Sequence, residues 1–186
     1  GERVNCVYEH IDWDASAAEK CGYPHFMIKE IMEQPEAIAK TIAPRISNGR
    51  IELGFKHITA EMLKKVNSIK IIGCGSAYHV GFVAGYFMRA ALRIPVESVL
   101  ASEFRYDDPI VDENTLAIVI SQSGETLDTL YGLREAKKHG AKTIAIVNVV
   151  GSTIANESED VLYTYPSFDA VHCASSRQDV RTTDRA

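Results

Sequence analysis

The sequence predicts a doubly wound α/β fold, a three-layer αβα sandwich built on a five-stranded parallel sheet. Between residues 69 and 164, short runs of β-branched and apolar residues alternate with helical segments, and this alternation is typical of parallel sheets. The runs are apolar on both faces, as strands are when helices cover both sides of a sheet. The 186 residues are enough for one such domain with short additions.

Helical segments precede the predicted sheet. Apolar residues recur at helical spacing over residues 26–32, and Pro35 is predicted to end that helix. Pro35 also fits the first turn of a second helix over residues 35–42, because a first-turn position needs no N–H donor. Asn48 and Gly49 form a turn signal.

A short amphipathic helix is expected just before the first strand, with Thr59 as its N-cap and residue 66 near its end. Helices to about residues 92 and 139 are then expected to follow the first and third strands. In the flavodoxin-like strand order 2-1-3-4-5, those two strands flank the point where a crevice opens. The five predicted strands are residues 69–72, 95–100, 116–120, 143–147 and 160–164.

The chain is expected to divide into three segments. Residues 1–24 show mixed polarity without a sustained period and are predicted to be a linker or the end of a preceding domain. Residues 25–164 form the predicted α/β domain. Residues 165–186 contain charged residues and no apolar period, so they are predicted to be an irregular tail.

Composition and charge exclude several classes of protein. The net charge is −5 with scattered lysines and arginines, so a basic face for nucleic acid is missing. No apolar run reaches the roughly 18 residues of a membrane-spanning helix, and no export signal opens the sequence. The four cysteines show no C-x-x-C spacing, which argues against a zinc site or a disulfide framework. A cytoplasmic location is therefore expected.

Two loops carry the residues best suited to chemistry. Residues 73–77 and residues 121–126 each follow a strand and enter a helix, where unpaired N–H groups and the helix dipole favour an anion. The second loop adds hydroxyls at Ser121, Ser123 and Thr126, which suit a phosphate group. Simple helix capping uses the same residue types and stays the alternative explanation.

Other kinds of site find less support. No G-x-x-x-x-G-K-[ST] motif occurs, and Tyr78 stands where a dinucleotide site needs its third glycine; no cofactor is therefore expected. His79 could line the crevice, but a capping or packing role is favoured. Glu125 is expected to act on the helix dipole rather than as a base.

Longer motifs resemble the sugar-isomerase (SIS) domain of the glutamine–fructose-6-phosphate aminotransferases, over residues 19–164 without a break. The S-Q-S-G-E-T motif at residues 121–126 indicates only the SIS superfamily. Its combination with two further motifs singles out these enzymes. The two are H-F-M-x-K-E-I-x-E-Q-P at residues 25–35 and A-S-E-F-R-Y at residues 101–106.

The resemblance implies which domain of such an enzyme carries out which step of the reaction. A glutaminase domain releases ammonia, and two SIS domains aminate and isomerise fructose 6-phosphate to glucosamine 6-phosphate. This chain resembles the first SIS domain, so residues 1–24 would be a linker or the end of the glutaminase domain. The implied contacts to the hexose 6-phosphate come from Cys74, Gly75, Ser76, Ser121, Gln122, Ser123 and Thr126.

The resemblance assigns the general base, the Schiff-base lysine and the ring-opening histidine to the second SIS domain and the C-terminal tail. The isolated chain is therefore expected to bind a hexose 6-phosphate without converting it. Where the family shows C-G-T-S, this chain has C-G-S-A at residues 74–77, and residues after 164 depart from the family. A non-catalytic sugar-phosphate sensor and a flavin carrier are the rival interpretations.

The helix after the first loop also predicts self-association. A lone SIS domain leaves uncovered the apolar helix faces that its partner domain would bury, and a two-fold homodimer is the expected outcome. The large apolar residues that would form this face are Phe82, Val83, Tyr86 and Phe87.

Overall fold

The computed structural model describes residues 20–164, which belong to two units, residues 20–34 and residues 35–164. The expected linker at residues 1–24, except for residues 20–24, and the expected tail at residues 165–186 lie outside the described residues. The second unit contains a five-stranded parallel sheet, as predicted. Its strands are β3 (Ser68–Gly73), β4 (Val96–Leu100), β5 (Thr115–Ser121), β6 (Lys142–Val147) and β7 (Asp160–Tyr163).

The strand order is β4-β3-β5-β6-β7, which is the predicted doubly wound order. All four neighbouring pairs are parallel, and the register places Ile71 of β3 between Ser98 of β4 and Ile118 of β5. The chain moves outward in one direction from β3 to β4 and in the other from β5 to β7. The carboxyl ends of β3 and β5 therefore meet where the connections diverge.

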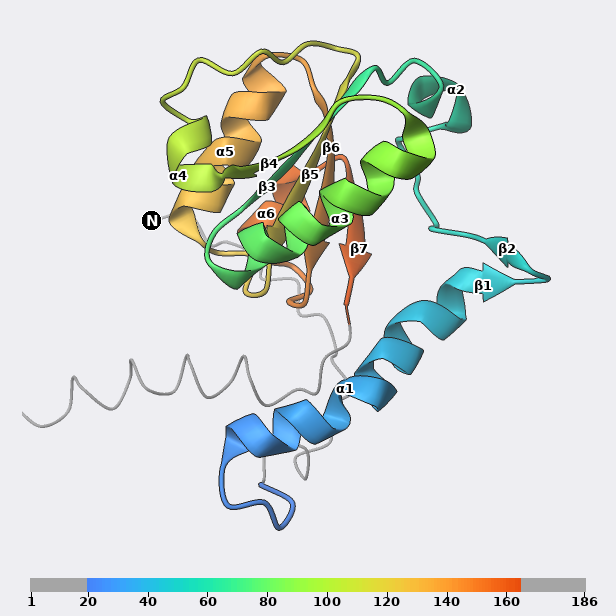
Figure 1. Ribbon diagram of the computed structural model, residues 1–186, viewed down its shortest axis with the longest axis vertical. Coiled ribbons are helices and arrows are strands. Elements are labelled where there is room, and N and C mark those ends of the chain that lie inside the picture. Colours follow the sequence, from blue (N-terminus) through green and yellow to red (C-terminus); the bar gives the residue numbers. More distant parts are fainter. Residues whose placement is uncertain (1–19, 165–186) are drawn as a thin grey trace, which may run out of the picture. The chain divides into compact units, whose positions relative to one another are not determined.

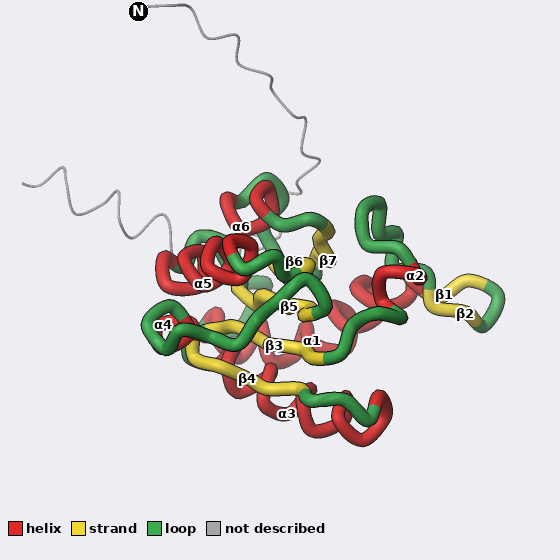
Figure 2. Tube along the Cα trace, turned by 90° about the horizontal axis from the view of Figure 1, so that it is seen from above, coloured by secondary structure: helices red, strands yellow, loops and turns green. Residues whose placement is uncertain are grey.

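Helices lie on both sides of this sheet (Figures 1 and 2), which completes the predicted sandwich. The helix α3 (Ser76–Leu92) covers one face, and α5 (Leu127–Lys138) and α6 (Thr153–Glu157) lie on the other. A four-residue helix, α4 (Ala101–Phe104), follows β4 directly. Helices α3 and α5 were predicted from the sequence, but α4 and α6 were not, because four and five residues are too few to show a helical period.

Two apolar clusters hold the layers together. On the side of α5, the buried residues Ile72, Phe104 and Leu133 belong to one cluster, and on the side of α3, Ile69 and Ile71 belong to the other. Successive strand residues point to opposite faces, so one apolar strand contributes to both clusters. Helix α3 comes close to the sheet at Gly81, where an added Cβ would lie 2.7 Å from Cγ2 of Ile71.

The prediction that Pro35 ends the first helix is wrong. A single helix, α1, runs over Phe26–Ile42 with Pro35 inside it. Proline removes its own N–H, which would otherwise bond the carbonyl of Ile31, and its ring crowds that carbonyl, but the effect is local to one turn. The remaining helical hydrogen bonds continue on both sides, so the two predicted helices are one.

The turn and cap predictions between α1 and β3 are confirmed. Asn48 and Gly49 join β1 (Ile46–Ser47) to β2 (Arg50–Ile51), and both have positive φ values of 51° and 72°. Positive φ at both central residues is the hairpin geometry that an Asn-Gly pair favours. Thr59 caps α2 (Ala60–Leu63), since its side chain accepts the N–H of Met62.

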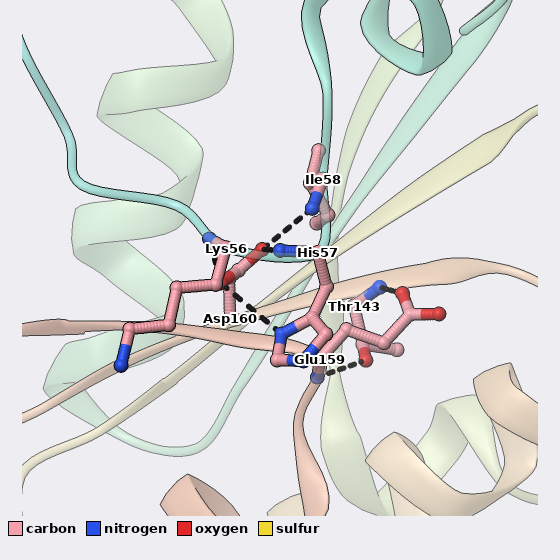
Figure 3. A network of polar contacts seen from close by, with 6 residues as sticks. All are labelled: Lys56, His57, Ile58, Thr143, Glu159 and Asp160. Carbon is pink, nitrogen blue, oxygen red and sulfur yellow. Dashed lines mark hydrogen bonds and ion pairs between the residues drawn. The ribbon is translucent and has the colours of Figure 1, made fainter.

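A buried carboxylate ties the segment before α2 to the sheet (Figure 3). Asp160, the first residue of β7, is 6% exposed. Its Oδ1 accepts the N–H of Lys56 at 2.8 Å, and its Oδ2 accepts the N–H groups of His57 and Ile58 at 3.0 and 2.7 Å. The His57 ring lies 3.5 Å from the same carboxylate. This contact lies at the amino end of β7, opposite the carboxyl ends of the strands.

Candidate phosphate-binding site

The two loops singled out in the sequence face one cavity of about 190 Å³. One loop leaves β3 and enters α3, and the other leaves β5 and enters α5. Because β3 and β5 are neighbours in the sheet, their carboxyl ends bring the loops together. The residues lining the cavity are Cys74, Ser76, Ala77, Ile120, Ser121, Gln122, Ser123, Thr126 and Thr129.

The first loop contributes a small cradle. Gly75 stands at the N-cap of α3 with φ 57° and ψ −129°, a conformation open to glycine and strained for other residues. Ser76, the first residue of α3, is exposed. Cys74 is half-buried, and its Sγ receives the hydroxyl of Thr129 at 3.7 Å. That contact links the first loop to the start of α5.

The second loop arranges its hydroxyls by internal hydrogen bonds. Ser121 is buried, and its Oγ accepts the N–H of Gly124 at 3.1 Å and lies 3.2 Å from Oγ1 of Thr126. The Oγ of Ser123 accepts the N–H of Glu125 at 3.2 Å. A hydroxyl that accepts one hydrogen bond keeps its own hydrogen to donate. The loop can therefore offer O–H donors to an anion in the cavity.

Helix capping does not account for Thr126. Thr126 is the N-cap residue of α5, yet within the described structure its side chain makes no capping hydrogen bond to the helix. Its hydroxyl points instead to Ser121 across the loop. The amino ends of α3 and α5 both lie at the cavity, and each brings unpaired N–H groups and the positive end of a helix dipole.

The donor set defines the chemistry that this cavity can support. Among the described residues, the lining contains hydroxyls, one thiol and one amide and has no lysine, arginine or carboxylate. Such a set binds an anion through hydrogen bonds and helix dipoles. The volume is below the roughly 300–1,000 Å³ of pockets that enclose a whole small molecule, which fits the phosphate end of a larger ligand.

Three residues of the lining, Ala77, Ile120 and Thr129, were not among the predicted contacts. Thr129 carried a signal, because it lies one helical turn after Thr126 and so shares its face of α5. Gly75 is not in the lining itself and connects two residues that are.

Two residues considered in the sequence analysis lie outside the cavity lining. His79 is exposed, and its ring packs edge-on against Tyr78 with 5.3 Å between centroids. Glu125 was expected to act on the dipole of the helix after the second loop, but it precedes Thr126, the N-cap of α5, and so lies outside that helix. Its Oε1 instead accepts the N–H of Thr153 at 2.7 Å, at the start of α6.

A second cavity, of about 270 Å³, offers no comparable chemistry. It lies beside the end of α1 and β7 and is lined mainly by apolar residues. Its one charged residue, Arg45, already donates to the carbonyls of Thr41 and Tyr163. An anion would therefore find few unused donors there.

Residues 20–164 contain no group of three or more histidine, cysteine, aspartate or glutamate side chains placed to hold a metal ion. None of the helices in this part of the chain combines the length and hydropathy needed to cross a bilayer.

An open parallel sheet with hydroxyl-bearing loops at its switch point defines the class of this protein as a doubly wound α/β domain. The sequence profile of the SIS domain family matches residues 62–176. The chain therefore belongs to the SIS domain family.

Individual relatives show which SIS domain proteins this chain is similar to. The chain is 54% identical to the glutamine–fructose-6-phosphate aminotransferase (isomerizing) of Clostridium acetobutylicum over 166 residues, which is 89% of this chain and 27% of the relative. It is 53% identical to the enzyme of the same name from Streptomyces coelicolor over 157 residues, or 84% and 26% of the two chains. The chain thus spans about a quarter of the length of these relatives.

Solved structures agree with the sequence comparison. The C-terminal domain of the glucosamine-fructose-6-phosphate aminotransferase from Francisella tularensis matches with a TM-score of 0.74 and 40% identity, over 79% of this chain and 41% of that one. Glucosamine-6-phosphate deaminase from Thermotoga maritima matches with a TM-score of 0.61 and 24% identity, over 78% and 42%. The second likeness concerns the fold alone.

Proposed function

We propose that this chain is the first SIS domain of a glutamine–fructose-6-phosphate aminotransferase and that it binds a hexose 6-phosphate between its two loops. The observation that carries the proposal is the cavity at the ends of β3 and β5, whose Ser121 and Thr126 hydroxyls face each other rather than capping α5. The identity of about one half to relatives of that name supports it. The proposed contacts are Cys74, Gly75, Ser76, Ser121, Gln122, Ser123 and Thr126.

The proposed role within the parent reaction is substrate binding. That reaction converts fructose 6-phosphate and glutamine into glucosamine 6-phosphate and glutamate, and both sugar phosphates would place their phosphate in this cavity. The glutaminase domain and the second SIS domain are the proposed partners in the parent chain. The catalytic base, lysine and histidine are assigned to that second domain, so the chain by itself should bind without turnover.

Titration of fructose 6-phosphate into single-site variants tests this proposal. The second loop offers three hydroxyls against one from Ser76, so Ser123→Ala should weaken binding about ten-fold and Ser76→Ala should weaken it less. A hydrogen bond to a charged group contributes about 1.5–3 kcal/mol, and about 1.4 kcal/mol corresponds to ten-fold in affinity. Calorimetry on the wild type and both variants makes the measurement.

The stability of both variants serves as the control, because hydroxyls at a loop surface contribute little to the core. The melting temperatures of Ser123→Ala and Ser76→Ala should therefore stay close to that of the wild type. Equal affinities for wild type and Ser123→Ala would show that the hydroxyls only organise the loop, and the proposed site would be wrong.

We also propose that the chain forms a two-fold homodimer through the outer face of α3. This face carries no charged residue between Ser76 and Met88, and its side chains point away from the sheet that Gly81 and Gly85 approach. An apolar face of this kind on a single helix marks an interaction surface. The exposed fractions are 59% for Phe82, 57% for Val83, 66% for Tyr86 and 66% for Phe87.

Light scattering at tens of micromolar should give the mass of a dimer for the wild type. Phe87→Glu should shift the protein to monomer, because two carboxylates would be buried at the two-fold interface without partners. Ile110→Glu provides the matched control, since Ile110 is 92% exposed in a different part of the surface. A wild type that is monomeric throughout would refute the proposed homodimer.

A further inference from the structure

The loop Ser121–Thr126 is fastened to the segment that leads into α6. The carbonyl of Gln122 accepts the N–H of Asn148 at 3.1 Å, and the carbonyl of Gly124 accepts the N–H of Ile154 at 3.0 Å. These are backbone contacts that any sequence could make. One side chain of the loop joins them, because the Oε1 of Glu125 accepts the N–H of Thr153 at 2.7 Å.

Helix α6 is a suitable anchor because its other end is held as well. At that end, Nε and Nη2 of Arg134 donate to the carboxylate of Glu157 at 2.8 and 2.6 Å, and the Lys137 ammonium donates to the Glu157 carbonyl. Both of these basic residues belong to α5. The loop that enters α5 therefore bonds the amino end of α6, and α5 itself bonds the carboxyl end of α6.

Glu125 lies at a junction between this anchor and the cavity. Its side chain bonds the start of α6, while its own N–H donates to the Oγ of Ser123. A shift of the Glu125 backbone would therefore move the group that orients the Ser123 hydroxyl. The carboxylate is directed toward α6, and Glu125 is not part of the cavity lining.

We propose that Glu125 is a positioning residue for the anion site, which holds the loop on α6 so that the hydroxyls of Ser123 and Thr126 face the cavity. The inference rests on the proposed function, in that the cavity is taken to bind the phosphate of a hexose 6-phosphate. Glu125 itself does not touch the ligand. This role requires that residue 125 carry a hydrogen-bond acceptor for the Thr153 N–H at the end of a side chain as long as that of glutamate.

That requirement separates positioning by a hydrogen bond from a role that depends on the charge of the carboxylate. Glutamine keeps an acceptor oxygen at the same distance along the side chain but has no charge and no basic group. Glu125→Gln should therefore bind fructose 6-phosphate within about two-fold of the wild type, whereas Glu125→Ala should bind at least about five-fold more weakly. A role that depended on the negative charge of the carboxylate would instead be lost in both variants.

A second variant removes the same hydrogen bond from the other side. Thr153 is the first residue of α6, a position that accepts proline without losing a helical bond. The preceding residue, Ser152, has φ −61° and ψ 158°, which suits a residue before proline. Thr153→Pro should thus leave Glu125 in place, delete its donor and weaken binding as much as Glu125→Ala does.

A matched control measures the loss of a helix cap away from the site. Thr59 caps α2 through the N–H of Met62, and α2 precedes the amino end of β3. Thr59→Ala should lower the melting temperature while leaving the affinity for fructose 6-phosphate unchanged. If the bond of Glu125 were only another cap, Glu125→Ala would behave like Thr59→Ala.

The experiment is a calorimetric titration of fructose 6-phosphate, with inorganic phosphate as a second probe, into the wild type and these four variants. The double variant Glu125→Ala/Thr153→Pro should bind as either single variant does, since both changes break one contact. Wild-type affinity in Glu125→Ala or Thr153→Pro would overturn the proposal, as would a Glu125→Gln variant as weak as Glu125→Ala. A wild type that binds neither probe would instead refute the proposed function.

Discussion

Replacing Asp160 by alanine is expected to lower the free energy of unfolding by about 3 kcal/mol, because it removes the acceptor for three backbone N–H groups. Those groups belong to Lys56, His57 and Ile58, and the contact to Ile58 is buried. Water cannot easily replace an acceptor at a buried N–H. The segment between β2 and α2 would lose its main polar link to the sheet.

Urea unfolding of a graded series measures this contribution. Asp160→Asn keeps one acceptor oxygen, although its amide NH2 then faces a backbone donor. It should therefore lower the free energy of unfolding by less than Asp160→Ala does, by about 1–2 kcal/mol. Asp107→Asn is the control, since Asp107 is exposed and should change stability by less than about 0.5 kcal/mol. If Asp160→Ala were as stable as Asp107→Asn, the carboxylate would have no structural role.

The same carboxylate should make stability depend on pH. Burial raises the pKa of Asp160, but the N–H donors of Lys56, Ile58 and His57, together with the His57 ring, outweigh burial and hold the pKa below its ordinary value. A folded pKa below the unfolded one gives stability that is present above the unfolded pKa, about 3.9 for aspartate. That stability is lost as the pH falls through the lower folded pKa.

The difference in stability between the wild type and Asp160→Ala should therefore be constant from about pH 5 to 8 and should shrink below about pH 4. Affinity for fructose 6-phosphate should not follow this change, because Asp160 is at the amino end of β7 and the cavity is at the carboxyl ends of the strands. A difference that grew as the pH fell would contradict the lowered pKa.

The sheet could be predicted from the sequence because its strands are short, mostly apolar runs. The run from Leu116 to Ile120 is continuous, and the observed strand extends it by one residue at each end, to Thr115 and Ser121. The flavodoxin-like strand order was expected from the alternation of strands and helices, and it places the first and third strands, which lead into the two glycine- and serine-rich loops, side by side. The shared cavity is a geometric consequence of that order.

The contacts that fasten the loops could not be predicted in this way. Glu125 and Thr153 are 28 residues apart and Asp160 and Lys56 are 104 apart, and neither pair follows a period of the sequence. Both are hydrogen bonds from a carboxylate to backbone N–H groups, which every residue except proline carries. The prediction at Pro35 was wrong for a related reason: proline removes one helical hydrogen bond, and whether the helix continues depends on the others.

Replacing Gly124 by alanine is expected to lower the free energy of unfolding by about 2–4 kcal/mol and to weaken fructose 6-phosphate binding at least ten-fold. Gly124 has φ 67°, and an added Cβ would lie 2.0 Å from Oγ and 2.5 Å from Cβ of Ser152. Rotation of the Ser152 side chain moves Oγ but leaves Cβ in place. The loop would have to move away from α6, taking the hydroxyls of Ser121 and Ser123 with it.

Two comparisons separate the steric overlap from backbone strain. Gly49→Ala carries the strain alone, since Gly49 has φ 72° and nothing lies within 4 Å of its added Cβ, so it should lose only about 1–2 kcal/mol. Ser152→Gly removes both overlapping atoms and suits an N-cap position, where glycine replaces serine at a loss of a few tenths of a kcal/mol.

The double variant Gly124→Ala/Ser152→Gly should therefore recover most of the stability and affinity lost in Gly124→Ala, leaving only the strain. Urea unfolding and calorimetric titration of the four proteins give the coupling between the two positions. Additive losses would mean that the contact between loop and α6 is loose and that Gly124 is needed only for its positive φ. Recovery would show that close packing against Ser152 sets the position of the loop and, with it, the donors that face the cavity.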